Sequence, residues 1–165
     1  MKKLCFTTMI AVFMLLCTNG LQAQTTQIKL DQVKIMQQGL GTWEAIVGKD
    51  TVQVLENQQY GKSFISNLSR VIKGTKSPVY INNYCFDSKD GKFKGFVLYA
   101  NGQYGTWIGL HTNEKMLILD IVQDFKPETV LMKNEIVLET PTKMTWTYFN
   151  TDGTKAQEFK YNKVK

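Results

Sequence analysis

The chain has 165 residues, of which 43% are hydrophobic, and 20 basic against 14 acidic side chains give it a formal net charge of +6. The lysines are scattered rather than clustered, which argues against a nucleic-acid-binding surface. The length fits a single domain that can bury roughly two-thirds of its unfolded surface.

The N-terminal residues have the layout of a secretory signal peptide. Lys2 and Lys3 precede an apolar run at residues 10–16, which is too short to span a bilayer, and polar residues follow. We expect cleavage after Ala23, which removes the two lysines and leaves one mature domain, residues 24–165. The sequence therefore predicts export to the periplasm or the extracellular space, with no transmembrane span.

The cysteines support neither a lipid anchor nor a disulfide. Leu16 precedes Cys17, whereas lipoprotein processing needs a small residue there, so lipid anchoring is not expected. Cys5 and Cys17 leave with the signal peptide, and Cys85 then has no partner for an intrachain disulfide. We expect Cys85 to be a buried apolar residue.

One short helix is predicted ahead of a long series of strands. Leu30, Val33, Met36 or Gln37, and Leu40 recur at steps of three and four within IKLDQVKIMQQGL, and glycines then end the pattern. After this point, strand-like runs alternate with turn residues, among which Asn101-Gly102 is the strongest signal. Strands are expected near residues 42–48, 51–56, 63–72, 79–87, 92–100, 103–112, 115–124, 129–139, 143–150 and 155–164.

The spacing of these strands predicts the fold class. They follow one another too closely for crossover helices, so consecutive strands must pair in an antiparallel meander. Closing such a sheet removes its exposed edges. We therefore expect an all-β protein, an antiparallel up-and-down β-barrel of about 8–10 strands with a short N-terminal helix.

This layout resembles the calycin superfamily, which includes the lipocalins and the fatty-acid-binding proteins. The resemblance lies in the helix, in Gly41-Thr42-Trp43 at the start of the first strand, and in the meander that follows. The segment 144–165 is similar to the final hairpin of small bacterial lipocalin-like domains of unassigned function. The sole arginine, Arg70, is on an early strand rather than a late one, which limits the resemblance to the broad superfamily. It implies a ligand-holding barrel, with Trp43 as a structural residue that closes its base.

Turn lengths predict which side chains point inward. Two-residue loops at Asn101-Gly102 and Asn113-Glu114 would fix the pairing of three strands and divide residues 92–122 between two faces. We expect the more apolar face to be the barrel interior. From it we predict the ligand-binding residues Tyr99, Tyr104, Ile108 and Leu119.

The opposite face raises two alternatives. It carries charges beside an apolar patch that is large for a solvent-facing sheet, so the helix or a second copy of the chain, in a homodimer, would have to cover it. Inverted faces are the other explanation, and Trp107, His111, Asp120 and Lys94 would then line the cavity. The patch consists of Phe96, Leu98, Trp107 and Ile118.

No group of residues predicts catalysis or a bound metal. The chain has one histidine, His111, and neither a thiol pair nor a Gly-x-Ser-x-Gly motif, so we expect no cofactor, no metal site and no catalytic residue. The segment 86–93, FDSKDGKF, resembles a calcium loop superficially, but a hairpin turn explains its residues. Asp120 and Asp124 would lie roughly 13 Å apart along a strand, wider than a hydrolytic carboxylate pair.

The aromatic content favours binding over chemistry. Nine Phe, seven Tyr and three Trp are many for this length, and tyrosine joins an apolar body to a hydroxyl group. The leading hypothesis is a non-enzymatic barrel that binds a small hydrophobic or amphipathic ligand. The alternative is a filled barrel that acts as a protein-interaction or homodimerising envelope module. Weaker alternatives are an enzyme and a haem-binding barrel with His111 as the iron ligand, as in the nitrobindins.

Overall fold

The computed structural model describes residues 30–165. The expected signal peptide, its cleavage site and Cys17 lie outside the described residues. Among residues 30–165, no helix combines the length and the apolar character needed to cross a membrane.

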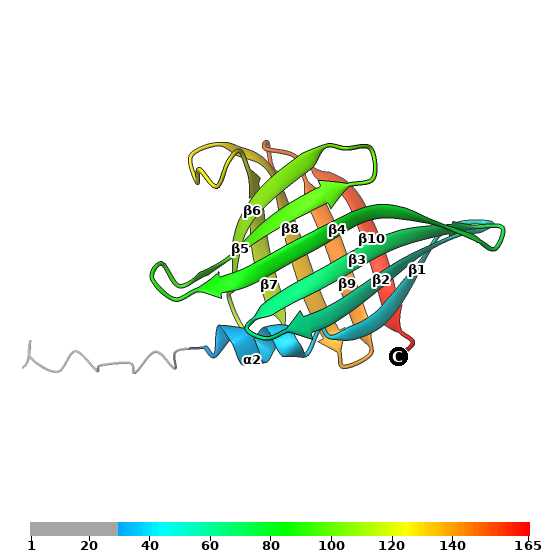
Figure 1. Ribbon diagram of the computed structural model, residues 1–165, viewed down its shortest axis with the longest axis horizontal. Helices are drawn as coiled ribbons and strands as arrows, with labels where there is room; N and C mark the ends of the chain where they lie inside the picture. Colours follow the sequence, from blue (N-terminus) through cyan, green and yellow to red (C-terminus); the bar gives the residue numbers. More distant parts are fainter. Residues whose placement is uncertain (1–29) are drawn as a thin grey trace, which may run out of the picture.

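The described residues form a closed antiparallel barrel of ten strands with one short helix, which confirms the expected fold class (Figure 1). Each strand pairs with the next one in the sequence, and β10 pairs with β1 to close the barrel. The elements are α2 (Gln32–Gln37), β1 (Gly41–Gly48), β2 (Thr51–Tyr60), β3 (Ser63–Ile72), β4 (Thr75–Asp87), β5 (Lys92–Tyr99), β6 (Tyr104–His111), β7 (Met116–Val122), β8 (Val130–Thr140), β9 (Lys143–Phe149) and β10 (Lys155–Lys163).

Helix α2 lies across one end of the barrel (Figure 1). Asp31 caps its N-terminus, because the Asp31 side chain accepts a hydrogen bond from the Lys34 backbone N–H at 3.0 Å. Ile35 and Met36 are buried against the barrel. We call this the helix end of the barrel, and the opposite end, where β5 turns into β6, the loop end.

The β5–β6 hairpin differs from the expected two-residue turn. Tyr99 N–H donates to the Gln103 carbonyl at 2.9 Å, so the loop has three residues and ends at Gly102, whose φ is +83°. A turn followed by a left-handed glycine is a standard three-residue hairpin, and Asn101 Oδ1 supports it by accepting from Gln103 N–H. The β6–β7 hairpin is also one residue longer than expected, since Thr112 N–H donates to the Met116 carbonyl.

Because each loop is one residue longer than expected, the side chains of β6 exchange their inward and outward positions, whereas those of β5 and β7 point as expected. A shift of one residue moves every side chain of a strand to the other face. Trp107 is therefore paired with Gly95 and Ile121, and it points into the barrel. Ile108 is paired with Lys94 and points outward, so the expected interior face was wrong for β6.

Trp43 lies at the seam where the barrel closes. Its side chain is fully buried, and it packs with residues of β2, β3, β9 and β10. The indole N–H donates to the Gly39 carbonyl at 2.9 Å, and Lys163 Nζ lies 5.2 Å from the ring centroid, within cation–π distance. Trp43 thus packs between the end of the helix segment and the last strand.

Two expectations about the outer surface were wrong. Cys85 is exposed rather than buried, because Tyr84 takes the inward position on β4 and Cys85 the next, outward one. Trp107 is buried inside the barrel and does not belong to the outer apolar patch. Phe96 and Leu98 are indeed outside, with 37% and 48% of their surfaces exposed.

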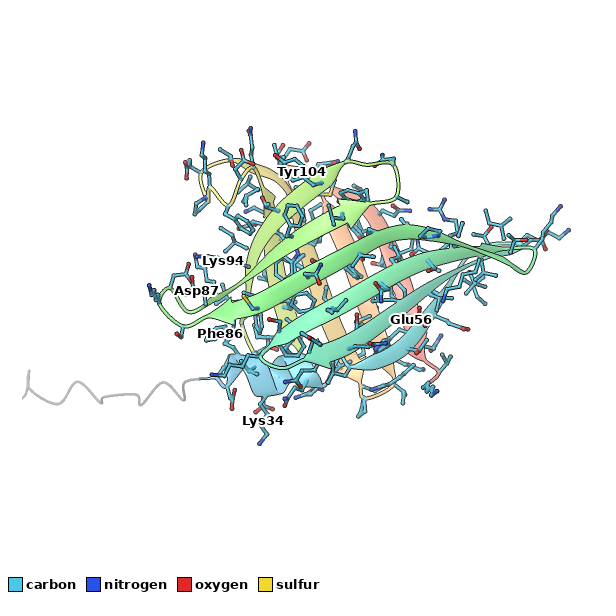
Figure 2. All side chains as sticks on the ribbon, in the orientation of Figure 1. Lys34, Glu56, Phe86, Asp87, Lys94 and Tyr104 are labelled. Carbon is cyan, nitrogen blue, oxygen red and sulfur yellow. The ribbon has the colours of Figure 1, made fainter. Side chains whose placement is uncertain are left out.

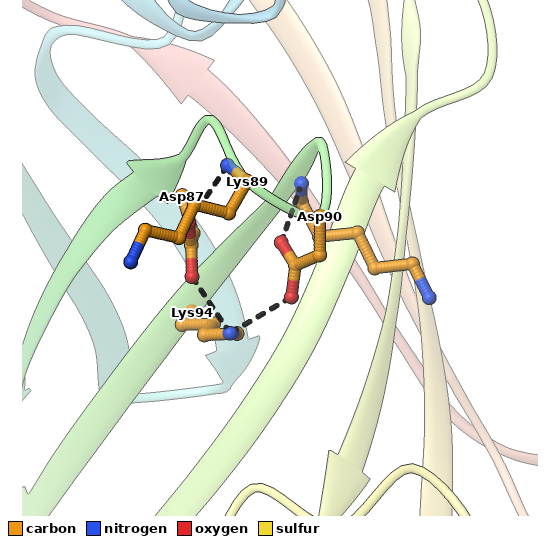
Figure 3. A network of polar contacts seen from close by, with 5 residues as sticks. Asp87, Lys89, Asp90 and Lys94 are labelled. Carbon is orange, nitrogen blue, oxygen red and sulfur yellow. Dashed lines mark hydrogen bonds and ion pairs between the residues drawn. The ribbon is translucent and has the colours of Figure 1, made fainter.

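The segment that resembled a calcium loop is a hairpin held by a lysine. Lys94 Nζ lies 2.8 Å from a carboxylate oxygen of Asp87 and 2.8 Å from one of Asp90 (Figure 3). The hydrogen bond from Lys94 is the main reason that the pKa of Asp87 is lowered. The ammonium group occupies the position between the two carboxylates.

Candidate functional site

A cavity of about 320 Å³ lies inside the barrel. Ile35 and Met36 of α2 line it at the helix end, and Tyr99 lines it next to the β5–β6 hairpin at the loop end. Between them the wall is largely apolar and aromatic, with Leu117 and Leu119 among its side chains. The alternation of each strand supplies these inward residues.

Four tyrosines line the cavity with neutral hydroxyl groups. Burial is the first cause that raises the pKa of Tyr80, Tyr84, Tyr99 and Tyr148 above the ordinary tyrosine value. The rings of Tyr80 and Tyr99 meet edge to face, with centroids 6.1 Å apart. At neutral pH these side chains offer O–H donors on an apolar body.

His111 lines the cavity and is only 8% exposed. Burial lowers its pKa to about 4, and a backbone contact with Met116 opposes this shift only in part. Neither ring nitrogen has a hydrogen-bond partner of good geometry within residues 30–165. The edge of the imidazole packs on Phe93, with centroids 6.1 Å apart. The ring is therefore neutral at physiological pH, with one donor and one acceptor unpaired.

Three other side chains that line the cavity carry a buried polar atom without a partner. They are the amide oxygens Oδ1 of Asn57 and Asn134 and the indole nitrogen of Trp146. Together with His111, they account for every such atom found among residues 30–165. Buried polar atoms normally have partners, so their concentration here is the feature that distinguishes the cavity from a plain core.

Other polar side chains of the cavity are paired with one another. The Trp107 indole N–H donates to Asn82 Oδ1 at 3.0 Å, and the Ser66 hydroxyl donates to the Tyr84 hydroxyl oxygen at 3.3 Å. These four residues lie on β3, β4 and β6. These two hydrogen bonds are made within the protein itself, without a ligand.

Two of the four predicted ligand-binding residues line the cavity. Tyr99 and Leu119 do so, whereas Tyr104 and Ile108 do not. Tyr104 is 59% exposed, stacks on Phe96 and donates to Asp124 at 3.3 Å near the loop end (Figure 2). The inverted face of β6 explains both differences.

The sequence contained signals for the residues that the first face assignment missed. The inverted alternative placed Trp107 and His111 in the cavity, and both are there. Its other two residues, Lys94 and Asp120, are outside, paired with Ile108. On β8, every second residue from 132 to 138 lines the cavity, namely Met132, Asn134, Ile136 and Leu138. Two of the three residues between them, Lys133 and Glu135, are charged, so this period of two could have identified Asn134.

The cavity offers burial and hydrogen bonds rather than reactive groups. Its charged lining residues are Glu114 and Lys115, both exposed in the β6–β7 hairpin. Within residues 30–165 no three His, Cys, Asp or Glu side chains gather closely enough to hold a metal ion. His111 is the one lining group that titrates near neutral pH in water, and its pKa is shifted far below that range.

No protein-family model matches this chain, and no curated protein matches it significantly. The resemblance to the calycins therefore rests on the order of the elements and on Gly41-Thr42-Trp43.

Proposed function

We propose that this protein binds a small hydrophobic or amphipathic molecule inside its barrel and performs no chemistry on it. The observation that carries the proposal is the hollow interior, a cavity of about 320 Å³ whose apolar and aromatic walls hold several unpaired polar atoms. This volume falls within the range of small-molecule sites, which starts at about 300 Å³.

The physical driving force is the burial of apolar surface. Side chains around an empty space lack contacts that a close-packed interior would provide. A ligand restores those contacts and removes its own apolar area from water, at roughly 25 cal/mol per Å². A filled barrel would have no such driving force, so the cavity favours ligand binding over the interaction-module alternative.

We also propose that the protein is an exported member of the calycin superfamily. The order of the elements, the closed barrel and the N-terminal sequence support this proposal. Expression in a Gram-negative host, followed by N-terminal sequencing of the periplasmic form, tests the export. A mature chain that begins at Gln24 is expected, and a chain that keeps Met1 in the cytosol would contradict export.

Binding is tested with N-phenyl-1-naphthylamine, an uncharged dye whose fluorescence rises in apolar surroundings. We expect the wild-type protein to bind it, and Leu119→Trp to weaken binding at least about tenfold because the larger ring fills the cavity. Leu110→Trp is the matched control, since Leu110 is exposed on the outer face of β6. Equal binding by all three proteins, or no binding by the wild type, would contradict the proposal.

A second candidate function is self-association through the outer face of β4, β5 and β6. Leu98 pairs with Ile81 on one side and Tyr104 on the other, and Phe96 stacks on Tyr104. All four side chains are substantially exposed. Sedimentation at micromolar concentration tests this candidate: a dimer that Leu98→Glu dissociates would support it, and a wild-type monomer would reject it.

A further inference from the structure

We propose that the ligand is an uncharged molecule whose polar end carries both hydrogen-bond donor and acceptor atoms, and that His111, Asn134 and Trp146 bind this end. This inference rests on the proposed function and specifies the chemistry of the ligand. The three residues form what we call the polar wall, on strands β6, β8 and β9.

The polar wall follows one row of the sheet, with the apolar Leu117 and Ile136 between His111 and Trp146. His111 pairs with Leu117, Leu117 with Ile136, and Ile136 with Trp146, so His111 and Trp146 lie in one row across four strands. Asn134 lies two residues along β8 from Ile136 and therefore points to the same side of the sheet. All five of these side chains line the cavity.

The polar wall offers hydrogen bonds of both kinds. The neutral imidazole of His111 has one N–H donor and one nitrogen acceptor, the Trp146 indole has an N–H donor, and Asn134 Oδ1 is an acceptor. None of these atoms has a protein partner among residues 30–165. A hydroxyl or amide group of the ligand both donates and accepts, so it matches the donors and acceptors of the polar wall.

The charge of the lining excludes an ionic headgroup as the preferred ligand. A buried carboxylate needs a cation beside it, and a buried ammonium needs an anion. The charged lining residues, Glu114 and Lys115, are exposed and opposite in sign at the helix end. Lys94 points outward and is held by Asp87 and Asp90. The polar wall itself carries no charge at neutral pH.

The facing side of the cavity suits the apolar part of the same molecule. Two polar pairs on this side are already formed within the protein, Ser66 with Tyr84 and Asn82 with Trp107, and Asn57 Oδ1 is the one buried polar side-chain atom there without a partner among residues 30–165. Val97 and Leu55 line the cavity beside these pairs. An apolar chain placed here leaves no protein hydrogen bond broken.

Competition with the bound dye tests the charge of the ligand. Three probes with the same ten-carbon chain, 1-decanol, decanoate and decylammonium, are titrated at pH 8 against the purified protein loaded with N-phenyl-1-naphthylamine. We expect 1-decanol to displace the dye at a concentration at least about tenfold lower than either ion. Equal displacement by decanoate or decylammonium would overturn this inference and leave the proposed function standing. Failure of both the dye and 1-decanol to bind would overturn the proposed function.

Substitutions in the polar wall test whether its residues bind the polar end of the ligand. Asn134→Leu and Trp146→Phe each delete one unpaired polar atom and keep most of the side chain. Since one lost hydrogen bond weakens binding by about tenfold, each variant should lose about that much affinity for 1-decanol relative to its affinity for the dye. Tyr104→Phe deletes a hydroxyl outside the barrel and should change neither. Unchanged affinity for 1-decanol in both wall variants would overturn the assignment.

Discussion

His111 shows how one buried residue makes stability depend on pH. The imidazole packs against Phe93 inside the barrel, with both nitrogens unpaired, and burial lowers its pKa from 6.5 to about 4. The unfolded chain exposes the same ring to water, where it gains a proton at a higher pH. Between these two values the unfolded state binds more protons than the native state.

The first prediction concerns this difference. Because the native pKa of His111 is lower, the free energy of unfolding should be highest above pH 6.5 and fall as the pH falls toward 4. The loss attributable to His111 should be at most about 3 kcal/mol, since each pKa unit corresponds to about 1.4 kcal/mol. Urea unfolding at a series of pH values measures it.

His111→Phe is the control for this prediction, because it removes the titrating group and retains an aromatic ring. Its unfolding free energy should vary less between pH 6.5 and 4.5 than that of the wild type. Asp87 also has a lowered pKa, but its contribution is lost below the usual aspartate range and remains in both proteins. Parallel pH profiles for the two proteins would contradict the assignment.

Gly95 is the second residue with a specific role, because Trp107 occupies the space where its side chain would be. A Cβ built on Gly95 overlaps the indole ring, whose N–H is bonded to Asn82. Gly95→Ala should therefore displace Trp107 and lower the free energy of unfolding by about 1–3 kcal/mol. Gly105→Ala is the matched control on the neighbouring strand, since its nearest contact would be an ordinary 3.5 Å to the Tyr99 ring. Equal effects of the two substitutions in denaturant unfolding would reject this explanation.

At the scale of elements, α2 is attached to the barrel at few points. Gln32 makes two hydrogen bonds with the His111 backbone, donating from Nε2 to the carbonyl at 2.9 Å and accepting at Oε1 from the N–H at 2.7 Å. The helix has only six residues and cannot be stable alone. Its position over the helix end of the cavity therefore depends on Gln32, on the exposed hydrogen bond from Gln37 to Gln59, and on the buried Ile35 and Met36.

The third prediction is that Gln32→Ala loosens the helix. The substitution removes both hydrogen bonds and should cost about 1–2 kcal/mol. Faster hydrogen exchange of the His111 amide and easier entry of the dye, seen as a higher association rate, are expected. Lys34→Ala is the control, because Lys34 is exposed and points away from the barrel (Figure 2). An unchanged exchange rate at His111 would show that the other contacts of the helix hold it without Gln32.

At the scale of the whole molecule, the pairs of neighbouring strands in the barrel differ in how many residues they pair. The β3–β4 ladder has ten register pairs, whereas β1 and β10 share two, Trp43 with Lys163 and Glu44 with Asn162. Backbone bonds between Thr42 and Val164 and between Thr42 and Lys165 extend this closure. The barrel is closed only while this seam is intact.

The fourth prediction is that the barrel opens first at this seam. Local opening costs least where few hydrogen bonds must break, so the amides paired between β1 and β10 should exchange with solvent at least about tenfold faster than those between β3 and β4. Native-state hydrogen exchange followed by NMR measures both sets in one sample. Slower exchange at the seam would mean that Trp43 and its neighbours stabilise the closure more than the hydrogen bonds suggest.

Ligand binding should also affect this seam. If the ligand binds only to the closed barrel, saturating dye should slow the hydrogen exchange of the amides between β1 and β10.

The sequence by itself determined the local features of this protein. Alternating residues and turn residues predicted ten antiparallel strands and a barrel. Both signals are local, because the period of two in a strand and the φ and ψ angles of a turn depend on residues that are neighbours in the sequence. Alternation within one strand placed Tyr99 and Leu119 inside. It failed for Tyr104 and Ile108, because Asn101-Gly102 fits both a two-residue and a three-residue loop.

Only the tertiary structure decided between those loops. The three-residue loops are compatible with Trp107 filling the space beside Gly95 and with Tyr104 stacking outside on Phe96. Such contacts join residues of different strands, and no local pattern describes them. The gathering of His111, Asn134 and Trp146 has the same origin, because it depends on the register of four strands at once. For that physical reason the barrel could be read from the sequence, whereas the polar wall of its cavity could not.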